Sequence, residues 1–483
     1  MIPHWLTKQA YLAPHRPAIE MESGDVITFH QLKEQSQRLA RQLATVGVKT
    51  GDHVGLLFTN HPSMVVTIHA LSYLGAVCVL LNHRLTKAEL LYQLEDADIS
   101  LLIIGDDLQS QGKELTFSGE ILTYDAITEV MEKQNVDLKG EIHLDDPFTI
   151  IYTSGTTGYP KGVVHTYGNH WWSAISSALN LGLHQDDKWL ATLPLFHVSG
   201  LSILMKSVIY GMPILLLDHF DPSRFNNVIN ERGVTIASVV TVMLQQCLQA
   251  LGENHYPDHF RCMLIGGGPV PTSLLEKAQA RHIPVFQSYG LTESSSQIVT
   301  LSPEDALTKI GSAGKPLFPA QITIHQPASD GVGEIFIKGP MVTKGYYQKE
   351  EITQQQFVDG WFKTGDLGYV DEAGYLYVVD RRTDLIISGG ENIYPAEIEN
   401  VLLKLDGIQD VGVVGVDDPQ WGQVPVACIV KNDQSLTAEE IIAFANQQLA
   451  RYKLPKKVYF FDELPRNAAK KLMRHKLIDM LKQ

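Results

Sequence analysis

The alternation of apolar and polar runs along the chain predicts helices that alternate with short buried strands. Thr28-Phe29-His30-Gln31 has the spacing of a capping box, and leucines recur on one face of the helix expected after it, at positions 32, 39 and 43. β-Branched and leucine-rich runs at 53–58, 77–81 and 101–104 predict strands, and the segments between them, at about 63–74 and 87–95, predict helices. Strands that alternate with helices favour parallel sheets covered by helices.

The same pattern continues through the middle of the chain and then changes. Asn169 is expected to cap a helix that runs from Trp171 to Leu179, an apolar helix is expected at 201–210, and strands are expected at 234–240 and 263–265. From about Gln321, short alternating segments at 322–325, 334–338 and 375–379 predict a part rich in β-strands. The predicted fold class is therefore α/β, with helices packed on mainly parallel sheets and a β-rich part.

A domain boundary is expected close to residue 380. Asp380-Arg381-Arg382-Thr383-Asp384 is charged and lies between apolar runs, which is typical of a linker. Beyond it, helices are expected at 397–405 and 438–449, and strands at 411–416, 424–430 and 458–461. We therefore predict an N-terminal domain (1–380), a hinge (381–384) and a small α+β C-terminal domain (385–483).

Length and charge narrow the class of protein. At 483 residues, with 44% hydrophobic and 19% charged residues, the chain is globular and too long for one ordinary core. A net charge of -15 argues against nucleic acid as a partner, and no run of 18 apolar residues predicts a membrane span. The start lacks the pattern of a signal peptide and the four cysteines form no paired motif, so a cytoplasmic protein without zinc or disulfides is expected. The oligomeric state stays open, a homo-oligomer included.

One loop carries the clearest chemistry. Tyr152-Thr153-Ser154-Gly155-Thr156-Thr157-Gly158-Tyr159-Pro160-Lys161-Gly162 follows an apolar run at 148–151 that predicts a buried strand. Its glycines let the backbone approach a ligand, and its hydroxyls and lysine supply donors for phosphate oxygens. The spacing is not that of a Walker loop, because Pro160 stands where the second glycine is required.

Seven separated stretches, in order, resemble the acyl-adenylate-forming (AMP-binding) family, in its acyl-CoA ligase branch. They are the loop above; Pro194-Leu195-Phe196-His197; Gly266-Gly267-Gly268; Gln287-Ser288-Tyr289-Gly290-Leu291-Thr292-Glu293; Trp361-Phe362-Lys363-Thr364-Gly365-Asp366; Asp380-Arg381-Arg382-Thr383-Asp384-Leu385-Ile386-Ile387-Ser388-Gly389-Gly390-Glu391-Asn392-Ile393; and Pro465-Arg466-Asn467 with Lys471. Each stretch alone is explained by a turn or an ion pair, but their common order over more than 300 residues carries the resemblance.

The resemblance implies a first step in which a carboxylic acid and ATP form an acyl-AMP and pyrophosphate, with fixed positive groups and Mg²⁺ at the phosphates. It implies these sites: Thr153–Lys161 at the β- and γ-phosphates, Thr292 at the α-phosphate, Glu293 with Thr153 at Mg²⁺, Asp366 and Arg381 at the ribose, and Tyr289 opposite Gly266-Gly267-Gly268 at adenine, beside Gln287, Ser288 and Gly290. The family usually has Asn or Asp where Gln287 stands.

In the second step implied by the resemblance, the thiol of coenzyme A attacks the acyl-AMP. Ser388-Gly389-Gly390 has no bulky side chain and is expected to let the pantetheine arm of CoA pass; the alternative is a simple hairpin. The family uses its mobile C-terminal domain in both steps by rotating it, and Thr383 falls at the hinge.

The last motif departs from the family, which usually reads Pro-Arg-Thr-x-x-Gly-Lys. The chain instead reads Pro465-Arg466-Asn467-Ala468-Ala469-Lys470-Lys471. Counting from Pro465 puts Lys471 at the catalytic position for acyl-AMP formation, with Lys470 where glycine normally stands.

Three stretches, at 168–180, 195–211 and 287–303, resemble the ligases of menaquinone synthesis that act on 2-succinylbenzoate, an aromatic keto-acid with two carboxylates. Lys206, alone in an apolar run, is a candidate partner for the carboxylate that does not react; the alternative is a lysine that snorkels from a surface helix. Gly268, Gln297 and Ser302 are further candidates for the acid, and His197 is a candidate to stack on its ring.

Two alternatives stay open. One is a ligase for another aromatic or medium-chain acid. The other, from a different class, is a sensor that binds a nucleotide or an acyl-adenylate without turnover. Such a sensor has no use for Lys471 or for a passage at Gly389 and Gly390.

Overall fold

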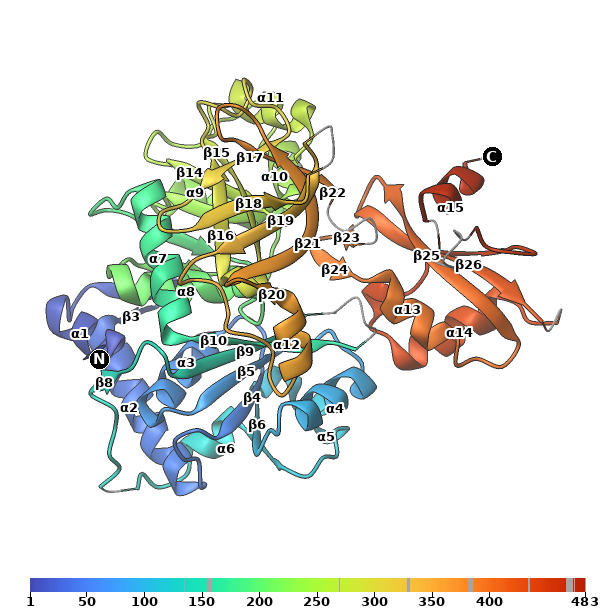
Figure 1. The fold of residues 1–483 in the computed structure, drawn as a ribbon. Helices are drawn as coiled ribbons and strands as arrows, with labels where there is room; N and C mark the ends of the chain where they lie inside the picture. Colours follow the sequence, from blue (N-terminus) through green and yellow to red (C-terminus); the bar gives the residue numbers. More distant parts are fainter. Residues whose placement is uncertain are drawn as a thin grey trace.

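The computed structural model describes residues 1–133, 135–153, 159–268, 270–327, 331–380, 385–432, 435–465, 472 and 474–482. A large part built from helices and sheets precedes residue 380, and a smaller α+β part follows residue 385 (Figure 1). The predicted fold class is confirmed.

The first sheet has the strand order β10-β9-β5-β4-β6-β7. It is parallel except for the antiparallel pair of β9 and β10. Its strands are β4 (His53–Leu57), β5 (Val77–Leu81), β6 (Leu101–Ile104), β7 (Glu120–Thr123), β9 (Pro147–Thr153) and β10 (Lys161–Thr166). The connecting helices are α3 (Pro62–Leu74), α4 (Lys87–Asp96), α5 (Gln109–Lys113) and α6 (Tyr124–Thr128). The loop expected to hold phosphate therefore joins the antiparallel pair β9 and β10, and its residues 154–158 lie outside the described residues.

The second sheet is continuous, and it has a half with mainly parallel strands and a half with antiparallel strands. Its strand order is β18-β19-β21-β22-β17-β16-β15-β14-β13-β11-β12-β2-β3, with β20 paired to β21. The half that is parallel except for its edge strand β3 contains β2 (Pro17–Met21), β3 (Val26–Thr28), β11 (Trp189–Ala191), β12 (Ile214–Leu216), β13 (Ile236–Val240), β14 (Cys262–Gly266) and β15 (Val285–Leu291). The antiparallel half contains β16 (Ser296–Leu301), β17 (Ser312–Pro316), β18 (Gln321–His325), β19 (Gly333–Lys338), β20 (Phe357–Val358), β21 (Trp361–Val370) and β22 (Leu376–Asp380). The predicted change of texture near residue 321 thus falls within the antiparallel half.

The remaining N-terminal elements cover these sheets or lie at their edges (Figure 1). They are β1 (Ile2–Pro3) paired with β8 (Glu141–Ile142), α1 (Trp5–Leu12), α2 (Phe29–Thr45), α7 (Tyr167–Leu181), α8 (Val198–Tyr210), α9 (Pro222–Glu231), α10 (Thr241–Leu251), α11 (Thr272–Ala280) and α12 (Glu350–Gln356). Helix α8 is buried over Gly200–Val208, so it lies in the core and is not a surface helix.

Two predicted helix starts had different outcomes. The capping box at Thr28 is confirmed, because the Thr28 hydroxyl accepts from the backbone N–H of Gln31 and the Gln31 side chain accepts from the N–H of Thr28. The prediction that Asn169 caps the next helix is wrong. Helix α7 begins at Tyr167 and Thr166 is its N-cap, while Asn169 completes the capping box from the third helical position.

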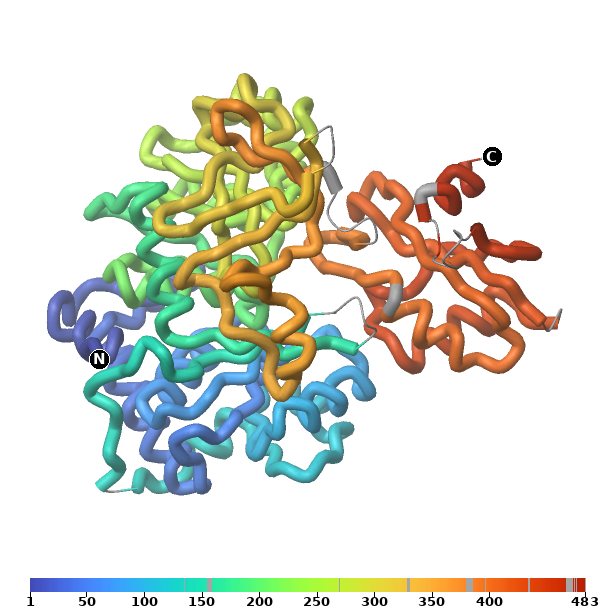
Figure 2. The backbone as a smooth tube through the Cα atoms, in the orientation of Figure 1, coloured from blue at the N-terminus to red at the C-terminus, as the bar shows by residue number. Residues whose placement is uncertain are grey.

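The C-terminal part is a sheet with helices on it. The strand order is β24-β23-β26-β25, with β27 parallel to β26. Its elements are β23 (Ile386–Ser388), β24 (Glu391–Ile393), α13 (Pro395–Leu402), β25 (Ile408–Asp418), β26 (Gly422–Lys431), α14 (Ala438–Gln448), β27 (Lys457–Phe460) and α15 (Arg474–Leu481). Figure 2 shows this part, in orange and red, beside the larger one. The predicted boundaries at 380 and 385 stay a prediction, since the intervening hinge lies outside the described residues.

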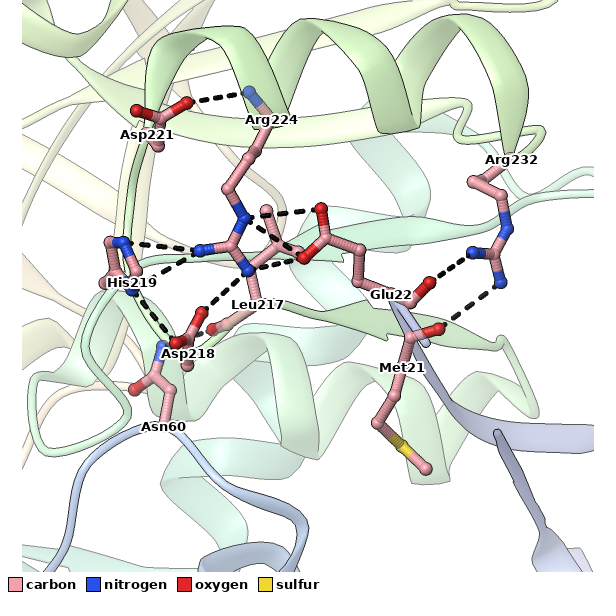
Figure 3. Close-up of polar contacts among 9 residues, drawn as sticks. All are labelled: Met21, Glu22, Asn60, Leu217, Asp218, His219, Asp221, Arg224 and Arg232. Atoms are coloured by element: carbon pink, nitrogen blue, oxygen red, sulfur yellow. Dashed lines mark hydrogen bonds and ion pairs between the residues drawn. The ribbon is translucent and has the colours of Figure 1, made fainter. Parts of the chain in front are cut away.

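A polar network ties together the loops that follow β2, β4 and β12 (Figure 3). Arg224 of α9 contacts the carboxylates of Glu22 and Asp218, at 3.0 Å and 2.9 Å. Asn60 donates to the carbonyls of Leu193 and Leu217 and accepts from the N–H of Leu195. The segment just before His197 is thereby tied to the first sheet.

Candidate active site

One cavity lies where the two N-terminal sheets meet the C-terminal part. Thr153 at the end of β9, Gly266 at the end of β14 and Lys206 on α8 line it from the N-terminal part. Gly390 and Glu391 line it from the C-terminal part. Carboxyl ends of parallel strands are a usual position for a binding site in such sheets.

The side of the cavity predicted to bind phosphate contains Thr153 and Thr292. Next to them, the hydroxyl of Tyr346 donates to Oε1 of Glu293 at 2.8 Å. The ammonium of Lys161 lies 5.0 Å from the centre of the same Tyr346 ring, a cation–π contact. Tyr346, which the sequence reading missed, therefore touches both the predicted phosphate lysine and the predicted metal carboxylate.

A buried histidine forms a hydrogen bond with the backbone of Thr292. His165 Nε2 lies 2.7 Å from the carbonyl oxygen of Thr292, and because a carbonyl only accepts, this nitrogen must carry the proton. Burial lowers the pKa of His165 to about 4, so the ring is neutral at pH 7. Thr149 on β9 links it to His170, with Oγ1 2.9 Å from His170 Nε2. The chain His165-Thr149-His170 thus fixes the backbone at Thr292.

The predicted Mg²⁺ site fits the donors that are present. Glu293 supplies a carboxylate and Thr153 a hydroxyl, the hard oxygen donors that Mg²⁺ prefers. Within the described ranges, no group of three or more His, Cys, Asp or Glu side chains is arranged to hold a metal ion. Mg²⁺ that arrives with ATP needs only one or two carboxylates in addition to phosphate oxygens.

The side of the cavity predicted to bind the nucleotide is lined by Gly266, Gly267, Ser288 and Gly290. The Nε2 of Gln287 is buried and finds no hydrogen-bond partner among the described residues. Gln287 is not among the described residues that line the cavity, so its contact with adenine stays a prediction.

Tyr289 and Asp366, which are both predicted to bind the nucleotide, form a hydrogen bond with each other. Tyr289 is buried, and its hydroxyl donates to Oδ2 of Asp366 at 2.7 Å. The backbone N–H of Asp366 donates to Thr364, so both the carboxylate and the main chain of Asp366 are positioned. Gly268 faces the C-terminal part, because a Cβ there would lie 3.2 Å from Ile387. Whether these residues bind nucleotide stays a prediction.

The other end of the cavity contains a buried lysine. Lys206 is 1% exposed, and its ammonium lies 4.9 Å from the centre of the Trp189 ring. No residue in the described part of the chain forms an ion pair or hydrogen bond with it, and burial lowers its pKa to about 7. The alternative of a lysine that snorkels to the surface is wrong, because α8 lies in the core.

The remaining candidates for the acid separate into two groups. Gln297 lines the cavity, and its Oε1 is buried without a partner in the described ranges. Ser296, also at the cavity, contacts Ser202 of α8. Ser302 does not belong with them: it lies beyond the end of β16 and donates to Asp305 at 3.4 Å. The placement of Ser302 in the acid site is therefore corrected, since the strand carries it away from the cavity.

The turn at Ser388-Gly389-Gly390 forms a hairpin between β23 and β24 and also reaches the cavity. Gly389 and Gly390 both have positive φ, +58° and +89°, where a side chain is strained. A Cβ on Gly390 would lie 3.1 Å from Val240 of the N-terminal part. The turn is thus a hairpin, as the alternative stated, and it also contacts the wall of the cavity.

Glu391, whose role the sequence reading missed, anchors this hairpin. Its carboxylate lies 2.7 Å from Arg84 and 3.1 Å from His197 Nε2, both of the N-terminal part. Burial raises the pKa of Glu391, but His197 and Arg84 outweigh burial and lower it to about 2. Its position directly after the glycine turn was the available signal.

Three predicted residues, Arg381, Thr383 and Lys471, lie outside the described residues, as does Lys470. Their roles stay predictions.

Comparison with known proteins identifies the family. Residues 6–347 match the AMP-binding enzyme family, and residues 397–471 match the AMP-binding enzyme C-terminal domain. The chain belongs to the AMP-binding enzyme family. The predicted resemblance is thereby confirmed.

Relatives cover the chain from end to end. A 2-succinylbenzoate–CoA ligase from Oceanobacillus iheyensis is 56% identical over 478 residues, 98% of each chain. Another from a Geobacillus species is 50% identical over 99% of this chain and 98% of its own. A double mutant of the o-succinylbenzoate CoA synthetase from Bacillus subtilis, bound to a product analogue, is 46% identical, with a TM-score of 0.95 over 99% of this chain and 98% of that one.

The same B. subtilis protein in complex with its acyl-adenylate intermediate gives a TM-score of only 0.76, at 45% identity over 98% of each chain. Because both are structures of one protein with nearly equal coverage, the difference reflects how their parts are arranged. This AMP-binding enzyme therefore has the arrangement seen with the product analogue. None of its described helices is long and apolar enough to cross a membrane.

Proposed function

We propose that this chain is an ATP-dependent acid–CoA ligase whose acid is 2-succinylbenzoate. In the first step the acid and ATP give an acyl-AMP and pyrophosphate, and in the second CoA displaces AMP to give the acyl-CoA. The family and the full-length relatives named as 2-succinylbenzoate–CoA ligases support the reaction.

The observation that carries the substrate is Lys206. A buried ammonium without an anion is costly, because burial removes its hydration. An acid that enters the cavity with a second carboxylate supplies that anion, whereas a fatty acid or benzoate does not. Gln297 also lines the cavity and offers an amide group for a polar part of the acid.

For the first step we propose that Thr153, Lys161 and Thr292 hold the phosphates, with the backbone of Thr292 fixed by His165. Glu293 and Thr153 would hold Mg²⁺, which supplies positive charge next to the phosphates. We infer that Asp366 and Arg381 bind the ribose and that Lys471 donates to the charge that develops at the α-phosphate.

For the second step we propose that the hairpin at Gly389 and Gly390 borders the path of the CoA thiol. This inference is supported by the arrangement of the chain, in which Gly390 lines the cavity. Residues 381–384 would be the hinge through which this arrangement changes.

A panel of acids with ATP and CoA tests the function. We expect pyrophosphate release that depends on the added acid, a product with the mass of 2-succinylbenzoyl-CoA, and the highest kcat/KM for 2-succinylbenzoate. A higher kcat/KM for a fatty acid would overturn the substrate. ATP binding without release of pyrophosphate for any acid would favour a sensor instead.

A further inference from the structure

A second buried lysine lies between the two parts of the chain. Lys453, 3% exposed, donates to Oε1 of Glu89 at 2.6 Å and to Oε1 of Glu397 at 2.7 Å. Glu397 and Lys453 belong to the C-terminal part, whereas Glu89 lies on α4 of the N-terminal part. Helix α14 packs against α4 at the same place (Figure 1).

Docking of the two parts changes the charge balance of this cluster. Lys453 and Glu397 alone form a neutral pair within the C-terminal part. Docking adds the carboxylate of Glu89, so one ammonium then serves two buried carboxylates. Burial raises the pKa of Glu397, and its second oxygen has no partner among the described residues.

Glu89 is nevertheless attracted to the docked position. Its oxygen touches the ammonium at 2.6 Å, and because an ammonium directs its hydrogens apart, the two carboxylates are farther from each other than from Lys453. The other oxygen of Glu89 accepts from the N–H and hydroxyl of Thr86, which closes the capping box of α4. Glu89 therefore has a fixed rotamer before Lys453 arrives.

The contact must depend on the arrangement of the two parts. The product-analogue and acyl-adenylate complexes of the B. subtilis relative match this chain with TM-scores of 0.95 and 0.76, from which we infer that the arrangement differs between them. Glu89 moves with one part and Lys453 with the other, so their contact belongs to the arrangement described above.

We propose that Glu89 is a positioning residue of the CoA step, which holds the C-terminal part through Lys453 in the orientation that brings Gly390 and Glu391 to the cavity. This role rests on the proposed two-step function. It assigns no contact with substrate to Glu89. It makes the prediction that loss of the Glu89 charge slows one half-reaction and spares the other.

The test is Glu89→Gln, with the two half-reactions measured separately. Glutamine keeps the helix cap, as Gln31 does at the equivalent position of α2. Adenylation is followed as pyrophosphate release from acid and ATP without CoA, and the CoA step as consumption of pre-made acyl-adenylate. Losing a hydrogen bond between charged groups predicts a CoA step slower by about tenfold or more, with adenylation within about twofold of wild type.

The matched control is Glu95→Gln, an exposed carboxylate on the same helix, which should leave both steps unchanged. Equal losses in both half-reactions, or an unchanged CoA step, would overturn the proposal. If the wild type itself releases no pyrophosphate with any acid, the proposed function fails instead.

A measurement of docking separates those cases. The four native cysteines are buried, so fluorophores can be placed at Glu276→Cys and Glu439→Cys, one exposed site in each part. In wild type and in Glu95→Gln, we expect a population of molecules with a short distance between the two fluorophores. In Glu89→Gln, we expect this population to be smaller. An unchanged distance distribution would overturn the role of Glu89 whether or not the chain is a ligase.

Discussion

The two ends of the cavity each contain a buried lysine, and the two lysines are opposite in electrostatic surroundings. Lys206 faces Trp189 and has no anionic partner among the described residues, and burial lowers its pKa to about 7. Burial also lowers the pKa of Lys453, but Glu397 and Glu89 outweigh it, so that pKa is raised. Partners, and not burial alone, decide the charge of a buried amine.

The difference indicates what each lysine is for. A cation that the protein leaves without an anion is suited to receive one from a ligand, whereas a cation with two carboxylates is satisfied by the protein itself. The acid end is also built from the N-terminal part alone. The CoA end exists only when the C-terminal part docks. Changes at the two ends should therefore affect different half-reactions.

The largest expected effect is at the docked end. Gly390→Leu places a side chain at a φ of +89° and directly against Val240, so the hairpin must move or block the thiol. We expect the CoA step to fall by about 100-fold or more, because misplacement by about 1 Å costs on that order, while acyl-AMP accumulates. Rapid quench with separate assay of acyl-AMP and acyl-CoA measures this.

The control is Gly24→Leu, since Gly24 has a φ of +99° in open space, lies between β2 and the edge strand β3, and is not among the described residues that line the cavity. It should leave both steps unchanged. A loss of adenylation together with the CoA step in Gly390→Leu would mean that the hairpin is only structural.

The two ends of the cavity also differ in how much of them could be predicted from the sequence. Lys206 was identifiable because one charged residue interrupts an apolar helix, a local pattern. That it cannot reach the surface follows only from the fold, which buries α8. Glu89 and Lys453 are 364 residues apart, and no local pattern pairs them. Local rules gave the strand Val77–Leu81 and the Thr28 cap, yet they misplaced the cap of α7, because Asn169 and Thr166 both suit an N-cap.

At the acid end, Lys206→Met should impair binding of one class of acid. Methionine keeps an apolar chain of similar length but removes the charge. Losing a hydrogen bond to a charged group, about 1.5–3 kcal/mol, predicts a KM for 2-succinylbenzoate higher by roughly 10- to 150-fold. The KM for benzoate should hardly change. Steady-state kinetics on both acids measures this, and equal effects on both would argue that Lys206 does not meet the second carboxylate.

The smallest expected effect is the uptake of a proton by Lys206 when the acid binds. With a pKa of about 7, Lys206 is mostly charged at pH 6 and mostly neutral at pH 8 in the free protein. A bound carboxylate favours the charged form and raises this pKa, so binding of 2-succinylbenzoate should take up a larger fraction of a proton at pH 8 than at pH 6. Affinity should accordingly weaken as pH rises through 7. The neighbouring thiol of Cys262 does not interfere, because burial raises its pKa to about 12.

Calorimetry in buffers of different ionisation enthalpy measures the proton uptake, and Lys206→Met should abolish this uptake. Uptake that persists in that variant would assign the proton to another group and break the contrast between the two lysines.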